Sequence, residues 1–429
     1  MTMTASPRVE IIAVGSELLT PNYQDTNSLE LTRRLNSIGL TVSFKSIVGD
    51  ESKTLARCLL DASARADLIF IMGGLGPTRD DNTRETLAEV FHLDLEVRED
   101  VLKDIRLRFQ RRGVRMPEVN LRQARVPKGA DVLTNRHGTA PGLWLNLEGR
   151  DFILLPGPPR EIIPMFESEV MPRLRRRRRG FQRRRVLKIA GLTESGVEDK
   201  IKDLYPNEPG LSLTILASPG QIELHLTSLS PDSAEAAESR LDRLSGQFEA
   251  RLGEHIFSCL GEELEETVGR LLRRREATLA VAESCTGGLL GHRITDVPGS
   301  SAYFLEGVQA YSNSAKISRL NVPTEIIETR GAVSPETAEY MARGVMDISG
   351  ADFGLSITGI AGPDGGSPEK PVGLVYTALA CWKGTRVEEN RFPGGRKIVK
   401  RRASQQALDM LRRHLLHRPD PPDASAGKK

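Results

Sequence analysis

The chain has 429 residues, a formal charge of +3 and 39% hydrophobic residues. This length exceeds one compact core, so we expect roughly two to four domains. The composition is that of an ordinary globular protein, which excludes collagen-like and low-complexity chains. Four cysteines are scattered without a C-x-x-C spacing, which indicates reduced thiols rather than a disulfide scaffold. With neither a signal-peptide pattern nor an apolar run of bilayer length, we predict a soluble, cytoplasmic protein with no membrane partner.

One segment distorts the charge balance. Residues 171–185 hold nine arginines and no acid; without these nine, 51 basic residues face 57 acidic ones, a balance of −6. A general basic coat for nucleic acid is therefore not indicated. The arginine-rich segment itself is either solvated charge at a domain junction, which we favour, or a contact for a phosphate backbone.

The amino-terminal part alternates strands with helices. Apolar runs predict strands at residues 9–14, 41–48 and 68–72, and helical spacing of apolar residues predicts helices at 26–38 and 52–64. This alternation predicts an α/β fold with a doubly wound, largely parallel sheet. Ligands of such sheets bind at the carboxyl ends of the strands.

A glycine-rich stretch follows the strand at residues 68–72. Residues 73–83 (GGLGPTRDDNT) carry Gly74, Gly76 and Thr78, where backbone amides could approach a phosphate. The adjacent acids could hold a divalent cation that bridges phosphate oxygens. The alternative is an ordinary turn that leads into an N-capped helix with acids in its first turn.

These motifs, in this order, resemble those of the CinA family, the competence/damage-inducible proteins. The matching segments are residues 15–19, 25–27, 48–50, 73–83, 138–142 and 156–161. The family's amino-terminal domain is similar to molybdopterin-binding domains and is associated with metal-dependent hydrolysis of the pyrophosphate in ADP-ribose. The resemblance implies that activity here, with Asp81, Asp50 and Glu161 around a divalent metal (Mg, Mn or Co). Thr20 and Pro21 depart from the family pattern, which more often has a glycine at this point.

A small α+β domain is expected in the middle of the chain. The pattern over residues 186–258 predicts the order β-α-β-β-α-β, and the CinA family has a KH-type module here. No Gly-x-x-Gly loop for nucleic acid lies between the predicted helices, so we expect a structural or dimerising spacer. The expected organisation is an amino-terminal domain (1–173), an arginine-rich linker (174–185), the middle domain (186–258), a carboxyl-terminal domain (259–417) and a disordered tail (418–429).

The carboxyl-terminal domain contains a short apolar run at residues 278–281, then residues 282–288 (AESCTGG), then an amphipathic run at 289–294. This order predicts a strand, a glycine-assisted turn and a helix. The unpaired amides at the start of a helix favour a developing oxyanion, so the turn suits a nucleophile. The alternative is an ordinary connection in which Ser284 only caps the helix.

A histidine is a poor candidate for the base that would activate Ser284. His292 lies about two turns into the helix after Ser284, and the domain's other two histidines lie at the end of the last predicted helix. A Ser-His-Asp triad is therefore disfavoured, and a lysine neutralised by burial remains. Lys316 follows a predicted strand, five residues after Tyr311. From spacing alone, a solvated surface lysine is the alternative.

The resemblance to the CinA family continues over residues 262–416, where the family has its nicotinamide-nucleotide amidase. It implies that Ser284 is the nucleophile and that Lys316, positioned through Tyr311, is the base. A further family motif matches residues 358–366 (TGIAGPDGG). The substrate-binding residues implied in this domain are Thr286, Gly287, Gly288, Gly359, Ile360, Ala361, Gly362 and Arg396. The alternatives are a mobile loop at 358–366 and an ordinary surface position for Arg396.

The reaction that the resemblance implies is hydrolysis of nicotinamide mononucleotide to nicotinic acid mononucleotide and ammonia, without a metal. Amides of residues 284–288, helped by Thr358, would hold the oxyanion. Cys285 is an alternative nucleophile at the start of a helix. A small buried thiol is the commoner state of such a cysteine, and the resemblance favours Ser284.

Two other functions stay open. The first is a regulatory, DNA-associated protein that contacts nucleic acid through the arginine-rich segment. The second is an amino-terminal domain that binds a pterin without hydrolysing ADP-ribose. In every case we expect a homodimer, because the sheet edges and the middle domain need covering.

Overall fold

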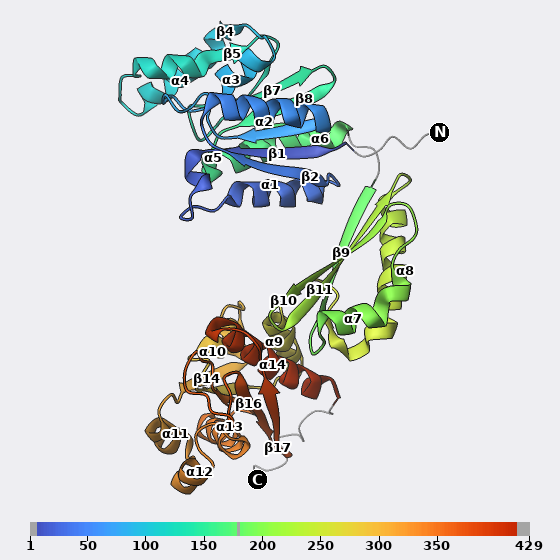
Figure 1. Cartoon of the computed structure of the whole chain (residues 1–429), viewed down its shortest axis with the longest axis vertical. Coiled ribbons are helices and arrows are strands. Elements are labelled where there is room, and N and C mark those ends of the chain that lie inside the picture. The colour runs from blue at the N-terminus through green and yellow to red at the C-terminus, as the bar shows by residue number, and fades with distance from the viewer. Residues whose placement is uncertain (1–6, 178–180, 418–429) are drawn as a thin grey trace. The chain divides into compact units, whose positions relative to one another are not determined.

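The computed structural model describes residues 7–177 and 181–417 (Figure 1). The chain divides into two compact units: one contains the residues up to 182 together with 229–234, and the other contains 183–228 and the chain from 235 onward. The expected tail at 418–429 lies outside the described residues. Within the described ranges, no helix combines the length and apolar character that crossing a membrane requires.

The amino-terminal domain is built on a six-stranded sheet of order β2-β1-β3-β8-β7-β6. The strands are β1 (Val9–Val14), β2 (Val42–Val48), β3 (Leu68–Met72), β6 (Asp131–Leu133), β7 (Gly142–Leu147) and β8 (Arg150–Leu155), with a separate pair of β4 (Leu95–Val97) and β5 (Arg125–Pro127). The helices are α1 (Thr26–Ser37), α2 (Ser52–Arg65), α3 (Thr83–Val90), α4 (Glu99–Arg111), α5 (Pro159–Met165) and α6 (Met171–Arg177).

The predicted doubly wound sheet is confirmed in its first four strands. Strands β2, β1, β3 and β8 run parallel, whereas β7 and β6 add an antiparallel edge that the sequence pattern did not predict. Along β1, Ile11 packs into one apolar cluster and Ile12 into the other, so the strand is buried on both faces. Such burial is typical of a central parallel strand covered by helices on each side.

The middle domain has the predicted order β-α-β-β-α-β and a sheet of order β10-β11-β9-β12. Its elements are β9 (Phe181–Ile189), α7 (Glu194–Ile201), β10 (Leu211–Ser218), β11 (Gln221–Ser230), α8 (Ala234–Leu252) and β12 (Ile256–Ser258). The arginine-rich segment differs from the expected linker. Its first part belongs to α6 and its last part to β9, with positions 178–180 outside the described residues.

Arginines of this segment form ion pairs with nearby carboxylates. Arg173 pairs with Asp131 at 3.0 Å in the first unit. Arg185 pairs with Glu238 at 2.6 Å and with Asp242 at 2.7 Å in the second unit. These pairs neutralise part of the charge that a nucleic acid would need.

The carboxyl-terminal domain has a five-stranded sheet of order β14-β13-β15-β16-β17. The strands are β13 (Leu279–Glu283), β14 (Phe304–Gln309), β15 (Phe353–Gly359), β16 (Leu374–Cys381) and β17 (Gly384–Arg391). The helices are α9 (Leu264–Arg274), α10 (Leu289–Thr295), α11 (Asn313–Leu320), α12 (Thr324–Thr329), α13 (Pro335–Ser349) and α14 (Arg396–His417).

Helices cover both faces of this sheet. The apolar residues of α9, α10 and α14 form one cluster with the sheet, and those of α11, α12 and α13 form two others. Strands β14, β13 and β15 run parallel, whereas β16 is antiparallel to β15 and places Cys381 opposite Phe353. The carboxyl ends of the three parallel strands therefore lie on the same side of the sheet, and the carboxyl end of β16 lies on the opposite side, where those three strands begin.

Candidate active site

The turn after β13 has the predicted form of strand, glycine turn and helix. The Ser284 N–H donates to the carbonyl of Ile357 on β15 at 2.9 Å, so the serine leaves the sheet beside its neighbouring strand. Gly287 and Gly288 have φ values of +58° and +89°. Residues with a side chain rarely adopt this left-handed backbone conformation, which explains why two glycines stand directly before α10.

Lys316 meets Ser284 beneath this turn. The Lys316 Nζ lies 3.0 Å from Ser284 Oγ, 2.9 Å from the carbonyl oxygen of Ala310 and 3.2 Å from that of Tyr311. The lysine is 1% exposed and the serine 8% exposed. The alternative of a solvated lysine is thus wrong, because α11 turns this side chain inward from the end of β14.

Burial lowers the pKa of Lys316, because removing the ammonium from water disfavours its charged form. A neutral amine has two N–H donors and one lone pair. The carbonyls of Ala310 and Tyr311 suit the two donors, which leaves the lone pair for the Ser284 hydroxyl proton. This arrangement suits a general base for a serine nucleophile.

Tyr311 and Arg396 form a second layer at the mouth of the site. The Tyr311 side chain is 62% exposed, and its hydroxyl accepts a hydrogen bond from Arg396 Nη2 at 3.0 Å. Arg396 Nη1 donates to the carbonyl of Gly362 at 2.9 Å. Tyr311 therefore contacts Lys316 through its backbone carbonyl, and its ring instead joins Arg396, which ties α14 to the 358–366 loop.

The 358–366 loop is fixed at its start by the strand pairing around it. Ile360 N–H donates to the carbonyl of Leu374 at 2.9 Å, and the Ile360 carbonyl accepts from Gly373 at 2.7 Å. A side chain on Gly359 would meet the Leu374 carbonyl at 2.6 Å, so only glycine fits. Ala361 is buried next in the chain, and Gly362 has a φ of +79°.

Thr358 is fully buried at the end of β15. Its hydroxyl donates to the carbonyl of Ala332 at 2.6 Å. In this arrangement the Thr358 proton is engaged away from Ser284. The expected contribution of Thr358 to an oxyanion site therefore stays a prediction that requires a change of hydrogen-bond partner.

Glu283 is a buried residue beside Ser284 that the sequence pattern did not single out. This carboxylate is 1% exposed and accepts the N–H groups of Gly288, Leu290 and Gly291 at 3.1, 3.0 and 2.8 Å. It therefore satisfies the first amides of α10 from inside the fold. The available signal was an acid at the end of an apolar strand, directly before a glycine-rich turn.

The amides that remain for an oxyanion are fewer than the sequence suggested. Gly288 N–H is bound by Glu283, and Gly287 N–H donates to the Ser284 carbonyl at 3.1 Å. Within the described ranges, the N–H groups of Cys285 and Thr286 donate to no other residue. The Thr286 hydroxyl is also buried and, in the same part of the chain, lacks a hydrogen-bond partner. These two amides are the best-placed donors for an oxyanion.

Cys285 is a poor rival to Ser284. Burial raises the pKa of its thiol to about 12. The thiolate is the nucleophilic form of cysteine, so this residue stays a protonated, inert thiol at neutral pH.

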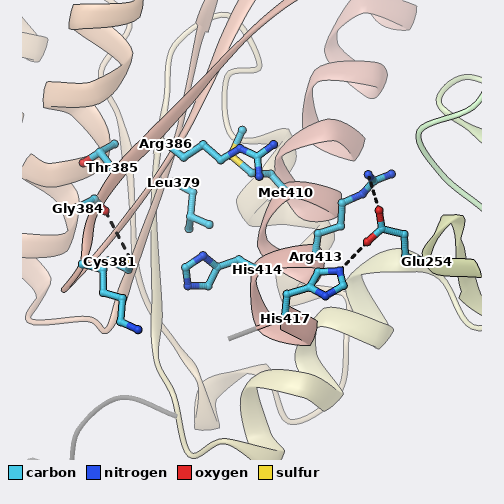
Figure 2. Close-up of a pocket in the computed structure, with 11 residues that line it drawn as sticks. Glu254, Leu379, Cys381, Gly384, Thr385, Arg386, Met410, Arg413, His414 and His417 are labelled. Atoms are coloured by element: carbon cyan, nitrogen blue, oxygen red, sulfur yellow. Dashed lines mark hydrogen bonds and ion pairs between the residues drawn. The ribbon is translucent and has the colours of Figure 1, made fainter. Parts of the chain in front are cut away.

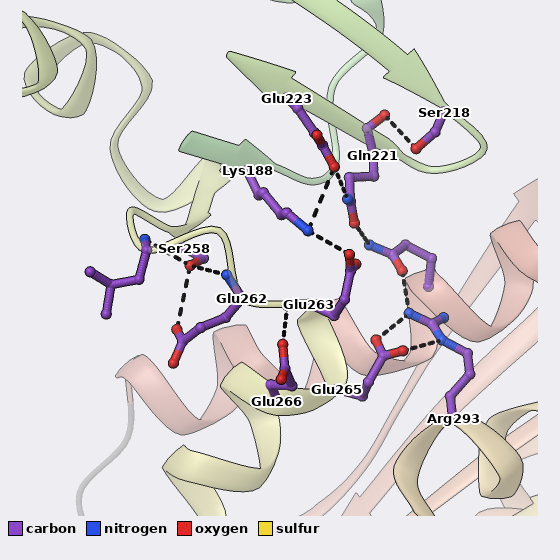
Figure 3. A network of polar contacts seen from close by, with 12 residues as sticks. Lys188, Ser218, Gln221, Glu223, Ser258, Glu262, Glu263, Glu265, Glu266 and Arg293 are labelled. Atoms are coloured by element: carbon purple, nitrogen blue, oxygen red, sulfur yellow. Dashed lines mark hydrogen bonds and ion pairs between the residues drawn. The ribbon is translucent and has the colours of Figure 1, made fainter. Parts of the chain in front are cut away.

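A polar network around Arg293 links helix α10 to its neighbours (Figure 3). Arg293, which is 2% exposed, donates to Glu265 on α9 at 2.7 Å and to Ser404 and Gln405 on α14 at 2.8 and 2.6 Å. Gln405 continues to Gln221 of the middle domain at 3.3 Å. Both ends of α10 are therefore fixed, and the turn that carries Ser284 is fixed with them.

The glycine-rich loop of the amino-terminal domain lies at the carboxyl end of β3, as predicted. A side chain on Gly74 would clash with the Thr83 hydroxyl, and one on Gly76 would meet the Asp81 carboxylate at 2.4 Å. The Asp81 carboxylate accepts hydrogen bonds from the backbone and hydroxyl of Thr78, at 2.9 Å for the backbone N–H. The loop is thus closed on itself around Asp81.

The three acids expected around a metal are placed differently from one another. The carboxylate of Asp50 accepts from Ser16 N–H at 2.9 Å, and the Asp50 carbonyl accepts from Asn82, the neighbour of Asp81, at 2.7 Å. Glu161 is bound instead by Asn135 at 2.8 Å. No cluster of three or more His, Cys, Asp or Glu side chains suited to a metal is found in the described part of the chain.

Magnesium is commonly held by one or two carboxylates together with substrate phosphates. Asp81 and Asp50 are carried by two loops joined through Asn82, and their chemistry suits that mode of binding. Glu161 does not join them in a preformed metal site, because its carboxylate is already bound by the Asn135 side chain.

A cavity of about 600 Å³ lies at the other edge of the carboxyl-terminal sheet (Figure 2). It is lined by residues around the β16–β17 turn and the end of α14, including Cys381, Gly384 and His414. Because β16 runs antiparallel to β15, this cavity and the Ser284 site lie at opposite ends of the strands. The cavity is therefore separate from the Ser284–Lys316 pair.

The fold and the site define a multidomain α/β protein with a buried Ser–Lys pair at the edge of its last sheet. Family models described as "Probable molybdopterin binding domain", "Damage-inducible protein CinA KH domain" and "CinA C-terminal domain" match residues 10–176, 184–258 and 261–415. A CinA-like protein from Koribacter versatilis is 46% identical over 95% of this chain and 99% of its own length. The chain belongs to the CinA family.

A second relative and one solved structure are also similar to this chain. A putative competence-damage inducible protein from Caldicellulosiruptor bescii is 43% identical over 95% of this chain and 99% of its own length. The crystal structure of the competence/damage inducible protein CihA from Agrobacterium tumefaciens is 39% identical, covers 37% of this chain and 100% of its own, and has a TM-score of 0.35.

Proposed function

We propose that the carboxyl-terminal domain hydrolyses the amide of nicotinamide mononucleotide, which gives nicotinic acid mononucleotide and ammonia. The observation that carries this proposal is the contact between the buried Lys316 Nζ and Ser284 Oγ at 3.0 Å, with two carbonyls on the remaining faces of the amine. A Ser–Lys pair of this kind is suited to acyl transfer. The choice of nicotinamide mononucleotide follows the resemblance to the family's amidase.

In the proposed first step, Ser284 Oγ attacks the carboxamide carbon while its proton passes to the neutral Lys316 Nζ. The amides of Cys285 and Thr286 donate to the oxygen that becomes negative. Lys316 then returns the proton to the departing nitrogen, which leaves as ammonia, and an ester remains on Ser284. A water molecule, deprotonated by Lys316, attacks this ester, and release of the acid restores the serine hydroxyl. The mechanism uses no metal.

The test is release of ammonia from nicotinamide mononucleotide by the purified full-length chain at neutral pH. Wild type should release ammonia and the acid in equal amounts, and Ser284→Ala should lose the activity. Equal turnover by wild type and Ser284→Ala, or no turnover by wild type with or without a metal, would contradict the proposal.

For the amino-terminal domain, we propose hydrolysis of the pyrophosphate bond of ADP-ribose. The supporting observation is the closed glycine-rich loop at the carboxyl end of β3, with Asp81 and Asp50 on adjoining loops. A divalent metal bound by these acids would neutralise phosphate charge and supply an activated water. Loss of ADP-ribose turnover in Asp81→Asn and on addition of a chelator supports the proposal, whereas turnover insensitive to both would contradict it.

A pterin-binding amino-terminal domain without hydrolysis predicts instead that a pterin competes with ADP-ribose for the loop. The DNA-associated function is less favoured, because Arg173 and Arg185 pair with carboxylates of the chain itself. A weak dependence of DNA binding on salt would exclude a contact through the whole arginine-rich segment.

A further inference from the structure

A second cation lies beside the catalytic turn, next to its glycines. Lys400 is on α14, one helical turn after Arg396, and its Nζ lies 3.6 Å from the position that a Gly287 side chain would take. Burial raises the pKa of the Cys285 thiol, and the nearby Lys400 ammonium opposes part of that rise. Lys400 therefore faces the turn that carries Ser284.

Lys400 differs in its pairing from Arg293 and Arg412, two buried arginines of the same domain. Arg293 is held by Glu265, and Arg412, later on α14, is held by Asp409 at 2.7 Å. No carboxylate within the described ranges pairs with Lys400, which is only partly exposed. A partly buried cation without a counter-ion is suited to an anionic group of a ligand.

Among the residues that the structure describes, the other polar groups around the turn are neutral or already hydrogen-bonded, so Lys400 is the cation available to an anionic ligand group. Arg396 already donates to the carbonyl of Gly362 and to the Tyr311 hydroxyl. At the next residue, the Gln309 amide nitrogen lies 2.4 Å from the position that a Gly288 side chain would take. The two glycines thus admit two nitrogen groups, a neutral amide and an ammonium, to the surface of the turn.

We propose that Lys400 binds the phosphate of the substrate and makes the Ser284 site selective for a mononucleotide over the corresponding nucleoside. This inference rests on the proposed amidase function and adds to it the residue that recognises the phosphate. Lys316 contacts Ser284, and Lys400 faces Gly287 of the same turn, so we place the substrate amide at Ser284 and its phosphate at Lys400. Arg396 then acts mainly by holding the loop at Gly362 and Tyr311.

The experiment compares nicotinamide mononucleotide with nicotinamide riboside, which has the same amide and no phosphate. In Lys400→Ala, KM for the mononucleotide should rise about 10- to 100-fold with little change in kcat, as expected for loss of one charge-assisted contact. The riboside should be hydrolysed as by wild type. Lys400→Arg should restore most of the mononucleotide affinity. Lys383→Ala, which removes the same charge at the other edge of the sheet, is the matched control and should behave as wild type.

An equal loss on both substrates, or an unchanged KM for the mononucleotide in Lys400→Ala, would overturn this inference while leaving the amidase proposal intact. If wild type hydrolyses neither substrate, the amidase proposal fails, and calorimetric binding of the mononucleotide decides the role of Lys400. Binding weakened at least about tenfold in Lys400→Ala supports the phosphate contact, and unchanged binding or none contradicts it.

Discussion

Glu283 gives the sharpest structural prediction, because one carboxylate satisfies three backbone amides. In Glu283→Gln, the side-chain oxygen can accept at most two hydrogen bonds, and the new amide group can accept none. At least one of the N–H groups of Gly288, Leu290 and Gly291 must then lose its acceptor. The loss of a buried bond to a charged group costs about 1.5–3 kcal/mol.

The assay is amide hydrogen exchange of the full-length chain, followed by mass spectrometry of the peptide that spans residues 284–291. Because about 1.4 kcal/mol is a factor of ten, exchange at the start of α10 should become roughly 10- to 150-fold faster. The kcat for amide hydrolysis should fall as well, since the same turn carries Ser284. Peptides from β1 and β3 of the amino-terminal domain should be unchanged.

The matched control is Glu306→Gln, the same acid-to-amide change at an exposed position of β14. Unchanged exchange at residues 288–291 in Glu283→Gln, or an equal acceleration in Glu306→Gln, would refute the assignment of Glu283 as the residue that fixes α10.

Three further predictions concern the same site. Burial lowers the pKa of Lys316, and the neutral amine is the active base, so kcat/KM should rise with pH along a limb below the usual lysine value of about 10.4; Lys316→Arg should lose this limb and about 10²- to 10⁴-fold in kcat. Cys285→Ala should keep most of its activity, and iodoacetamide should not inactivate wild type at neutral pH, because the thiol pKa is about 12. Gly288→Ala, at a φ of +89°, should lose about 1–2 kcal/mol of stability in a thermal melt and also displace Gln309. A limb at or above about pH 10.4, inactivation by the reagent, or an unchanged melting temperature would contradict the respective prediction.

Local pattern was enough to predict several parts of the structure. The apolar runs indicated β1, β3 and β13 to within a residue or two at each end, and the strand and helix order of the middle domain was correct. The exclusion of histidine left a lysine as the candidate base, and the resemblance to the CinA family implied Lys316. These features depend on residues that are close together in the sequence, so one sequence is enough to predict them.

The parts that could not be predicted depend on contacts between distant segments. Arg396 and Tyr311 meet across 85 positions, so nothing in the sequence indicated that the Tyr311 hydroxyl bonds Arg396 while its backbone carbonyl contacts Lys316. In the sequence, Glu283 is only a polar residue at the end of a strand; its hydrogen bonds to the first amides of α10 appear only in the folded chain. Lys400 lies beside Gly287 because α14 packs next to the turn, and the sequence alone does not indicate that packing.

Attack of Ser284 on the amide, with transfer of its proton to Lys316, is tested most directly by mass spectrometry of the enzyme quenched during turnover of nicotinamide mononucleotide. We predict a burst of ammonia ahead of the acid, an acyl adduct on the peptide that contains Ser284, and neither signal in Ser284→Ala or Lys316→Met. An adduct on Cys285, or full turnover by Ser284→Ala, would contradict it.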